Sequence, residues 1–97
     1  MKGSELVLKA LKEKGINYIF GYTGGAIMPI FDEMEKQKIF SFVMSRHEQG
    51  AAFMAQGISR ASVSTSNPQI GVCMATSGPG AMNLVTGIAD AGMDSVP

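Results

Sequence analysis

A strand pattern runs directly into a charged turn in the stretch 40-FSFVMSRHEQG-50. Apolar side chains at alternate positions from Phe40 to Met44 have the two-residue period of a β-strand. The residues from Glu48 to about Ala61 are small or helix-forming, so they predict a helix. The charged turn therefore lies between the end of a strand and the start of a helix.

The same order of strand, turn and helix is repeated on both sides of this stretch. We expect, in sequence, a helix capped by Ser4 and ended by Gly15, a strand at 16–20, a helix from about 27 to 36, a surface loop at 62–68, a strand at 70–75, and a helix with Leu84, Val85, Ile88 and Ala89 on its apolar side. Parallel strands need crossover connections, so this order predicts an α/β fold, a three-layer parallel sheet with helices on both faces. Three strands are few for such a sheet. We therefore interpret residues 1–97 as one partial domain, the N-terminal part of a truncated fold.

Composition excludes several classes of partner. The 97 residues carry eight Lys and Arg against eight Asp and Glu, without a basic run, which argues against nucleic acid and anionic membranes. None of the apolar segments is long enough to span a bilayer, and the start of the chain lacks a signal-peptide pattern, so we expect a cytoplasmic protein. The lone Cys73 lies in an apolar run and predicts a buried, inert thiol. A small molecule or another protein is the expected partner.

All three predicted strands end in unusual residues, and ligands of open parallel sheets bind beyond the carboxyl ends of the strands. Two of these turns, at 21–26 and 76–81, are rich in glycine, and Gly80 would spare space beside a ligand. Neither turn matches a dinucleotide or P-loop motif, which excludes nucleotide phosphate binding. Taken alone, such glycines more often only satisfy backbone geometry, and a glutamate such as Glu48 at a helix start more often only favours the helix dipole. A lone His47 provides neither a zinc site nor a catalytic triad.

Two glycines of the predicted helix and the many methionines are explained by packing rather than by function. Gly50 and Gly57, within the helix after the charged turn, are expected to let a neighbouring element approach closely. The chain also contains eight methionines, most of them on predicted apolar faces, so filling of the core explains them better than a redox role.

Four blocks, at 18–26, 46–52, 75–81 and 83–88, resemble the catalytic large subunit of acetolactate synthase in order and spacing. The resemblance covers nearly the whole chain and implies the pyrimidine-binding domain of the thiamine-diphosphate-binding fold. It also implies the activity of that family, a transferase that condenses pyruvate with a second 2-oxoacid in branched-chain amino-acid biosynthesis. Thiamine diphosphate would be the cofactor and the electron sink.

By this resemblance, Glu48 would be the catalytic carboxylate, hydrogen-bonded to the N1′ nitrogen of the aminopyrimidine ring. That role requires a raised pKa, which we expect from burial between subunits. The remaining implied roles fall on the glycine turns and their flanks. Cofactor binding is assigned to Glu48, Gly24, Gly25, Ser77, Gly78, Pro79 and Asn83, and the substrate cavity to Gly24, Ala26 and Gln49.

The resemblance extends to partners that this chain cannot hold by itself. Mg²⁺ and FAD belong to the full-length family, and no residue of this chain is assigned to a metal. We expect a homo-oligomer with its active site at a subunit interface, a regulatory small subunit, and an isolated chain that is inactive. Two alternatives stay open. The chain is a non-catalytic remnant or assembly module, which Thr23 in place of the family's usual proline favours, or it is a fragment of a related decarboxylase or acetyltransferase.

Overall fold

A computed structural model describes residues 2–97 and places three parallel strands in one sheet. The strands are β1 (Tyr18–Gly21), β2 (Ser41–Met44) and β3 (Cys73–Met74), in the order β2-β1-β3. Tyr18 is opposite Ser41, and Phe20 is opposite Cys73. The predicted parallel sheet is therefore confirmed, with β1 at its centre.

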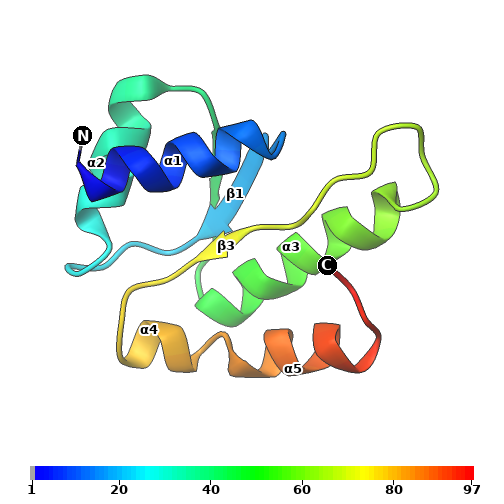
Figure 1. Cartoon of the computed structure of the whole chain (residues 1–97). Helices are drawn as coiled ribbons and strands as arrows, with labels where there is room; N and C mark the ends of the chain where they lie inside the picture. The colour runs from blue at the N-terminus through cyan, green and yellow to red at the C-terminus, as the bar shows by residue number, and fades with distance from the viewer. Residues whose placement is uncertain (1) are drawn as a thin grey trace.

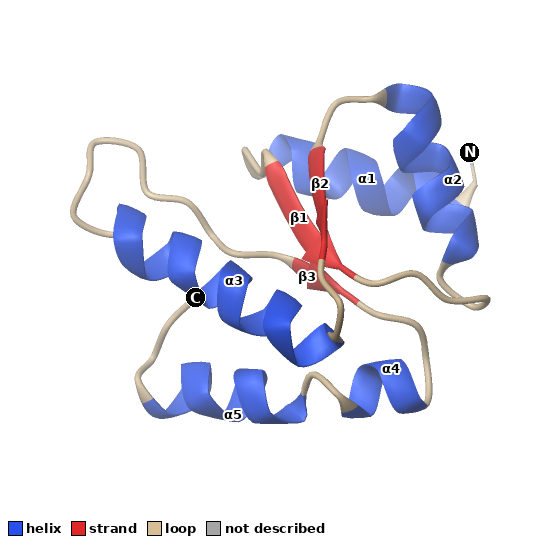
Figure 2. Cartoon of the chain, turned by 180° about the vertical axis from the view of Figure 1, so that it is seen from behind, coloured by secondary structure: helices blue, strands red, loops and turns tan. Residues whose placement is uncertain are grey.

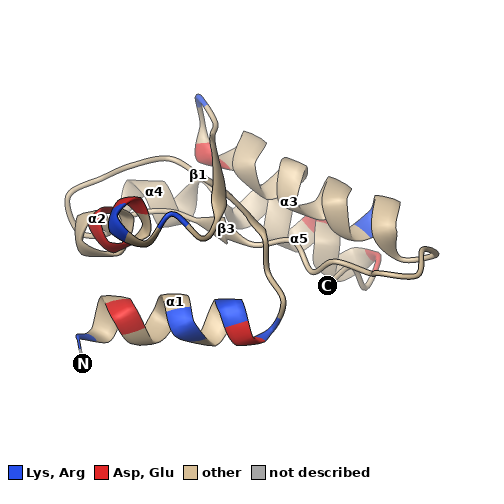
Figure 3. Cartoon of the chain, turned by 90° about the horizontal axis from the view of Figure 1, so that it is seen from above, with Lys and Arg blue, Asp and Glu red and all other residues tan. Residues whose placement is uncertain are grey.

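Helices cover both faces of this sheet. One side carries α1 (Gly3–Glu13) and α2 (Met28–Gln37), and the other carries α3 (Glu48–Ser62), the short α4 (Pro79–Met82) and α5 (Val85–Met93) (Figures 1 and 2). This arrangement confirms the expected three layers. Basic and acidic residues are interspersed along α1 and α2 (Figure 3). Among residues 2–97, none of the helices has the length and apolar character needed to cross a membrane.

The central strand β1 supplies the core of both layers. Ile19 is fully buried in the same cluster as Leu8, Ile16 and Met34, on the side of α1 and α2. Its neighbour Phe20 packs with alanines of α3 instead. Successive side chains of a strand point to opposite faces, so one apolar run serves both layers. The expectation of a buried strand here is confirmed, beginning at Tyr18 rather than at residue 16.

The ends of two predicted elements differ from the structure. Ser4 lies inside the first turn of α1, while Lys2 occupies the N-cap position without a capping side chain, so the predicted Ser4 cap is wrong. The helix does end before Gly15, whose φ of 77° is the left-handed conformation that glycine adopts at helix ends. The third strand is shorter than predicted. The Val72 carbonyl still accepts a hydrogen bond from the Phe20 N–H of β1, but the Gly71 N–H donates to Ser59 Oγ of α3, at 2.7 Å, rather than to a strand.

The predicted last helix is broken into α4 and α5, and its larger apolar side chains are not buried. Val85 is 52% and Ile88 59% exposed, so the prediction of one helix with a buried apolar side is wrong. The residue that packs against α3 is Gly87, where an added Cβ would overlap the Ala52 side chain. A glycine and an alanine at the contact let α5 lie close to α3 while longer side chains face outward.

The glycines and methionines also behave differently from expectation. An added Cβ at Gly57 would meet no atom within 4 Å, and one at Gly50 only Ser45 Cβ at 3.9 Å, so neither allows a close approach. The close approaches lie at Gly71 and Gly87 instead. Met34 is buried, but five methionines are exposed, so core filling is wrong for most of them: Met28, Met44, Met54, Met82 and Met93. They lie on faces that this chain leaves uncovered.

Candidate functional site

Three turns meet where the strands of the sheet end. The segments after β1 and β3 leave the sheet on the same side, near the start of α3 (Figure 1). Two hydrogen bonds join the turns across long stretches of sequence. The Ala26 N–H donates to Thr76 Oγ1 at 3.2 Å, and Asn83 Nδ2 donates to Glu48 Oε1 at 3.0 Å. The predicted convergence of the strand ends is present in the structure.

Glu48 is the first residue of α3 and is only 7% exposed. The residue before it, His47, has extended backbone angles and is the N-cap, and its Nδ1 accepts a hydrogen bond from the Gln49 N–H at 3.1 Å. This bond satisfies one of the free N–H groups at the helix start. The carboxylate of Glu48 also lies at the positive end of the helix dipole, where a negative charge is stabilised.

The two carboxylate oxygens of Glu48 have different surroundings. Oε1 accepts the hydrogen bond from Asn83, which follows α4 in the chain. Oε2 faces Gly80, where an added Cβ would lie 3.3 Å away. The glycine therefore leaves that side of the carboxylate free of a side chain. One oxygen is held by Asn83, and the other lies beside Gly80.

The pKa of Glu48 is lowered from its usual value. The hydrogen bond from the Asn83 amide contributes most, followed by the backbone N–H of Glu48 itself, and the charge of His47 adds a smaller effect; burial opposes these by raising the pKa. The raised pKa that we expect from burial between subunits concerns the assembled enzyme and stays a prediction. Neighbouring atoms cover the Glu48 side chain, but little protein lies beyond them, so fixed hydrogen-bond donors outweigh desolvation. A carboxylate held in this way is ionised near neutral pH.

Replacing Asn83 by leucine is expected to raise the pKa of Glu48, because the largest cause of its lowering is removed. A lowered carboxyl pKa contributes stability above the unfolded-state pKa, and this contribution is lost as the pH falls through the folded-state pKa. The N83L variant should therefore be less stable than the parent near neutral pH, because part of that contribution is lost. Its stability should also fall less steeply as the pH is lowered. A carbon NMR titration of the Glu48 carboxyl group measures the shift. N17L, at an exposed asparagine before β1, is the control; equal titration curves in both variants would contradict this account.

The other predicted site residues have varied positions. Gly24 packs against Thr76, since an added Cβ would lie 2.5 Å from Thr76 Cβ, and Gly78 has a φ of 76°, which favours glycine. An added Cβ at Gly25 would meet no atom within 4 Å. Gln49 is half-buried and bonds to His47 through its backbone. The remaining two residues are exposed at the start of α4: Ser77 and Pro79.

Thr76 connects two of the turns and was missed as a site residue. It bonds to Ala26, packs on Gly24 and lies close to Gly80. The available signal was a β-branched hydroxyl residue at the end of a strand, directly before the glycine turn. That signal is weak, because β-branched residues are favoured in strands for their own packing.

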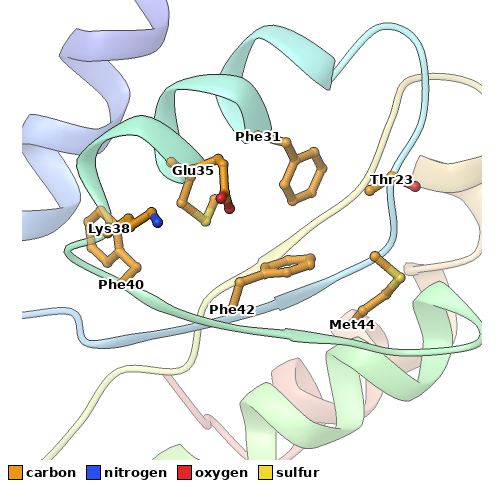
Figure 4. A pocket seen from close by; sticks show the side chains of 8 residues that line it. Thr23, Phe31, Glu35, Lys38, Phe40, Phe42 and Met44 are labelled. Carbon is orange, nitrogen blue, oxygen red and sulfur yellow. The ribbon is translucent and has the colours of Figure 1, made fainter.

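An open hollow lies apart from Glu48. It has a volume of about 550 Å³ and is bordered by α2 and the edge strand β2 (Figure 4). Phe31 and Phe42 meet there edge to face, with ring centroids 4.9 Å apart. The hollow is lined by Thr23, Phe31, Met34, Glu35, Lys38, Phe40, Phe42 and Met44. Among the predicted turns, only the loop after β1 reaches it, through Thr23.

The structure also bears on metal binding and on the lone thiol. Within residues 2–97, no group of three or more His, Cys, Asp and Glu side chains is arranged to hold a metal ion. Cys73 is half-buried, and burial raises the pKa of its thiol, with a smaller opposite effect from its backbone hydrogen bond. A raised pKa keeps the thiol protonated, as predicted for an inert cysteine.

Comparison with known proteins gives consistent matches over this whole region. Residues 1–97 match the family described as thiamine pyrophosphate enzyme, N-terminal TPP binding domain. The acetolactate synthase isozyme 2 large subunit of Escherichia coli (strain K12) is 50% identical over 97 residues, which is 100% of this chain and 17% of that protein. The acetolactate synthase large subunit of Lactococcus lactis subsp. lactis (strain IL1403) is 50% identical over 95 residues, 98% of this chain and 16% of that protein. The probable acetolactate synthase large subunit of Methanocaldococcus jannaschii is 50% identical over 97 residues, 100% of this chain and 15% of that protein. The chain thus spans about one sixth of the length of these relatives.

Proposed function

Because the chain belongs to the thiamine pyrophosphate enzyme N-terminal TPP-binding domain family, we propose that it forms the pyrimidine-binding part of an acetolactate synthase. The relatives at 50% identity are named for this activity, which supports the choice within the family. The observation that carries the proposal is the placement of Glu48. Its carboxylate is held at a helix start by Asn83 and faces Gly80, which has no side chain.

The residues around Glu48 fit the aminopyrimidine ring of thiamine diphosphate. A ring nitrogen can share a proton with a carboxylate. Glycine at position 80 keeps a side chain away from the second carboxylate oxygen, since a Cβ there would lie 3.3 Å from Oε2. When bound, thiamine diphosphate supplies the nucleophilic carbon and the electron sink for reactions of 2-oxoacids. The task of this chain is to hold and move a proton at one oxygen of Glu48.

Proton transfer by Glu48 requires a pKa closer to neutral than the lowered value of the single chain. Covering the site with a second subunit would remove water and raise that pKa. We therefore propose a homo-oligomer with its active site at a subunit interface. In that assembly, cofactor contacts are proposed for Gly24, Gly25, Ser77, Gly78, Pro79 and Asn83, and a substrate-cavity border for Gly24, Ala26 and Gln49.

The further properties of the proposed enzyme depend on parts of a longer protein. Mg²⁺ and FAD would be bound by residues outside 1–97, and a regulatory small subunit would bind to the assembled enzyme. We propose a cytoplasmic location and a role in branched-chain amino-acid biosynthesis.

A chimaeric enzyme tests the proposal. Residues 1–97 would replace the aligned segment of the Escherichia coli isozyme 2 large subunit, to which they are 50% identical over 97 residues. We expect this chimaera to form acetolactate from pyruvate only in the presence of thiamine diphosphate. A second chimaera, with the aligned segment of the Lactococcus lactis protein, controls for tolerance of such grafts, since that segment is also 50% identical to this chain. If both chimaeras fold but only the control chimaera is active, the proposal is contradicted.

A second candidate is an assembly module without catalysis. The exposed apolar side chains of α4 and α5 favour it, because Met82 is 68% and Met93 84% exposed. Surfaces of this kind commonly mark protein contacts. This candidate predicts a chimaera that assembles but forms no acetolactate. The remaining alternative, that the chain is a fragment of a related decarboxylase or acetyltransferase, predicts turnover of pyruvate to other products.

A further inference from the structure

Thr76, the second residue after β3, contacts the loop that follows β1. Its Oγ1 accepts a hydrogen bond from the Ala26 N–H at 3.2 Å. Gly24 lies against the same side chain, since an added Cβ there would be 2.5 Å from both Thr76 Cβ and Cγ2. The loop therefore rests on Thr76 through one hydrogen bond and one close backbone contact.

The methyl group of Thr76 faces the other glycine turn. An added Cβ at Gly80 would lie 2.9 Å from Thr76 Cγ2 and 3.3 Å from Glu48 Oε2. Gly80 is thus the residue between the Thr76 methyl group and the Glu48 carboxylate. The methyl group lies against both the loop at Gly24 and the Gly80 turn, and the hydroxyl bonds to the loop alone.

We propose that Thr76 is a positioning residue that sets the spacing of the loop at 24–26 and of the Gly80 turn around Glu48. This inference rests on the proposed function. The Thr76 hydroxyl holds the loop assigned to the substrate cavity by a hydrogen bond, and its methyl group packs against both this loop and the turn beside the carboxylate that serves the cofactor. The hydroxyl therefore acts on the loop alone, and the methyl group acts on both parts of the site.

A purely structural role is the simpler alternative, because β-branched residues pack well at strand ends. Valine would satisfy that role as well as threonine does. Valine has no hydroxyl to accept the hydrogen bond from Ala26, whereas serine keeps the hydroxyl and lacks the methyl group. The two variants T76V and T76S therefore separate positioning from packing.

Kinetics of the chimaeric holoenzyme give the first test. For T76V we expect KM for pyruvate to rise about fivefold, as for the loss of one neutral hydrogen bond, with cofactor affinity nearly unchanged. For T76S we expect an affinity for thiamine diphosphate lower by about three- to fivefold, because about one methyl group that packs against the Gly80 turn is lost. Equal effects of both variants on both constants would overturn the proposal.

Amide hydrogen exchange of the cofactor-free chimaera gives a second test that needs no activity. Exchange in the segment 22–30, measured by mass spectrometry, should become faster in T76V than in the parent, because the hydrogen bond from the Ala26 N–H is lost. If the segment exchanges alike in T76V and in the parent, Thr76 does not hold the loop and the inference is wrong. This result is independent of acetolactate formation, so failure of the proposed function and failure of the inference are distinguished.

Discussion

Replacing Glu48 by glutamine in the chimaeric enzyme is expected to lower kcat for acetolactate formation by about 10²- to 10⁴-fold, the usual contribution of a positioned acid or base. The amide has nearly the shape of the carboxylate and can still accept a hydrogen bond from Asn83, so the local structure should persist. It cannot exchange a proton with a ring nitrogen of the cofactor. Steady-state rates at saturating thiamine diphosphate measure the loss.

A matched substitution shows whether the effect belongs to the site. Glu35 is an exposed glutamate of α2 at the open hollow beside β2, so E35Q changes the same charge at a different place. We expect its activity to stay within a factor of two of the parent. Circular dichroism should give the same spectrum for both variants. An E48Q enzyme that keeps more than a tenth of the parent activity would remove Glu48 from the catalytic role.

Local sequence patterns were sufficient to predict the fold class. Alternation over residues 40–44 and the apolar run before Gly21 predicted two of the strands, and helical periodicity predicted α1 and α2. The incorrect predictions lie where packing between segments that are distant in sequence determines the structure. The third strand is short because Ser59 of α3 accepts a bond from the Gly71 N–H, 12 residues away in the chain. No local pattern contains that partner.

Prediction of the candidate site was limited in the same way, by contacts between segments that are distant in sequence. Glu48 and the glycine turns could be located because the carboxyl ends of parallel strands lie together. The partners that define their chemistry are far apart in sequence, 35 residues for Glu48 and Asn83 and 50 for Ala26 and Thr76. The direction of the Glu48 pKa shift follows from the first of these pairs. No local sequence pattern contains the Asn83 hydrogen bond, so the lowered pKa of Glu48 in the single chain could not be predicted from the sequence.

The contact between Gly71 and α3 gives the largest expected effect on stability. In G71A the new Cβ would overlap the backbone carbonyl of Ala55, and neither backbone segment can yield as a flexible side chain would. The segment before β3 would have to move away from α3. That movement would cost the hydrogen bond from Gly71 to Ser59 and the one from the Phe20 N–H to the Val72 carbonyl. With about 1 kcal/mol for each bond and 1–3 kcal/mol for overpacking, we expect a loss of about 3–5 kcal/mol.

The same chemical change at Gly57 should have the opposite sign. Gly57 is exposed within α3, and an added Cβ would meet no atom within 4 Å. G57A is therefore expected to stabilise the chain by about 0.5–1 kcal/mol, because alanine is the better helix former. Urea unfolding of the 97-residue chain, followed by circular dichroism, compares the two variants directly. Since small domains are stable by only about 5–15 kcal/mol, G71A should be largely unfolded at urea concentrations where G57A is still folded. A loss below about 1 kcal/mol in G71A would mean that the segment before β3 does not rest on the backbone of α3.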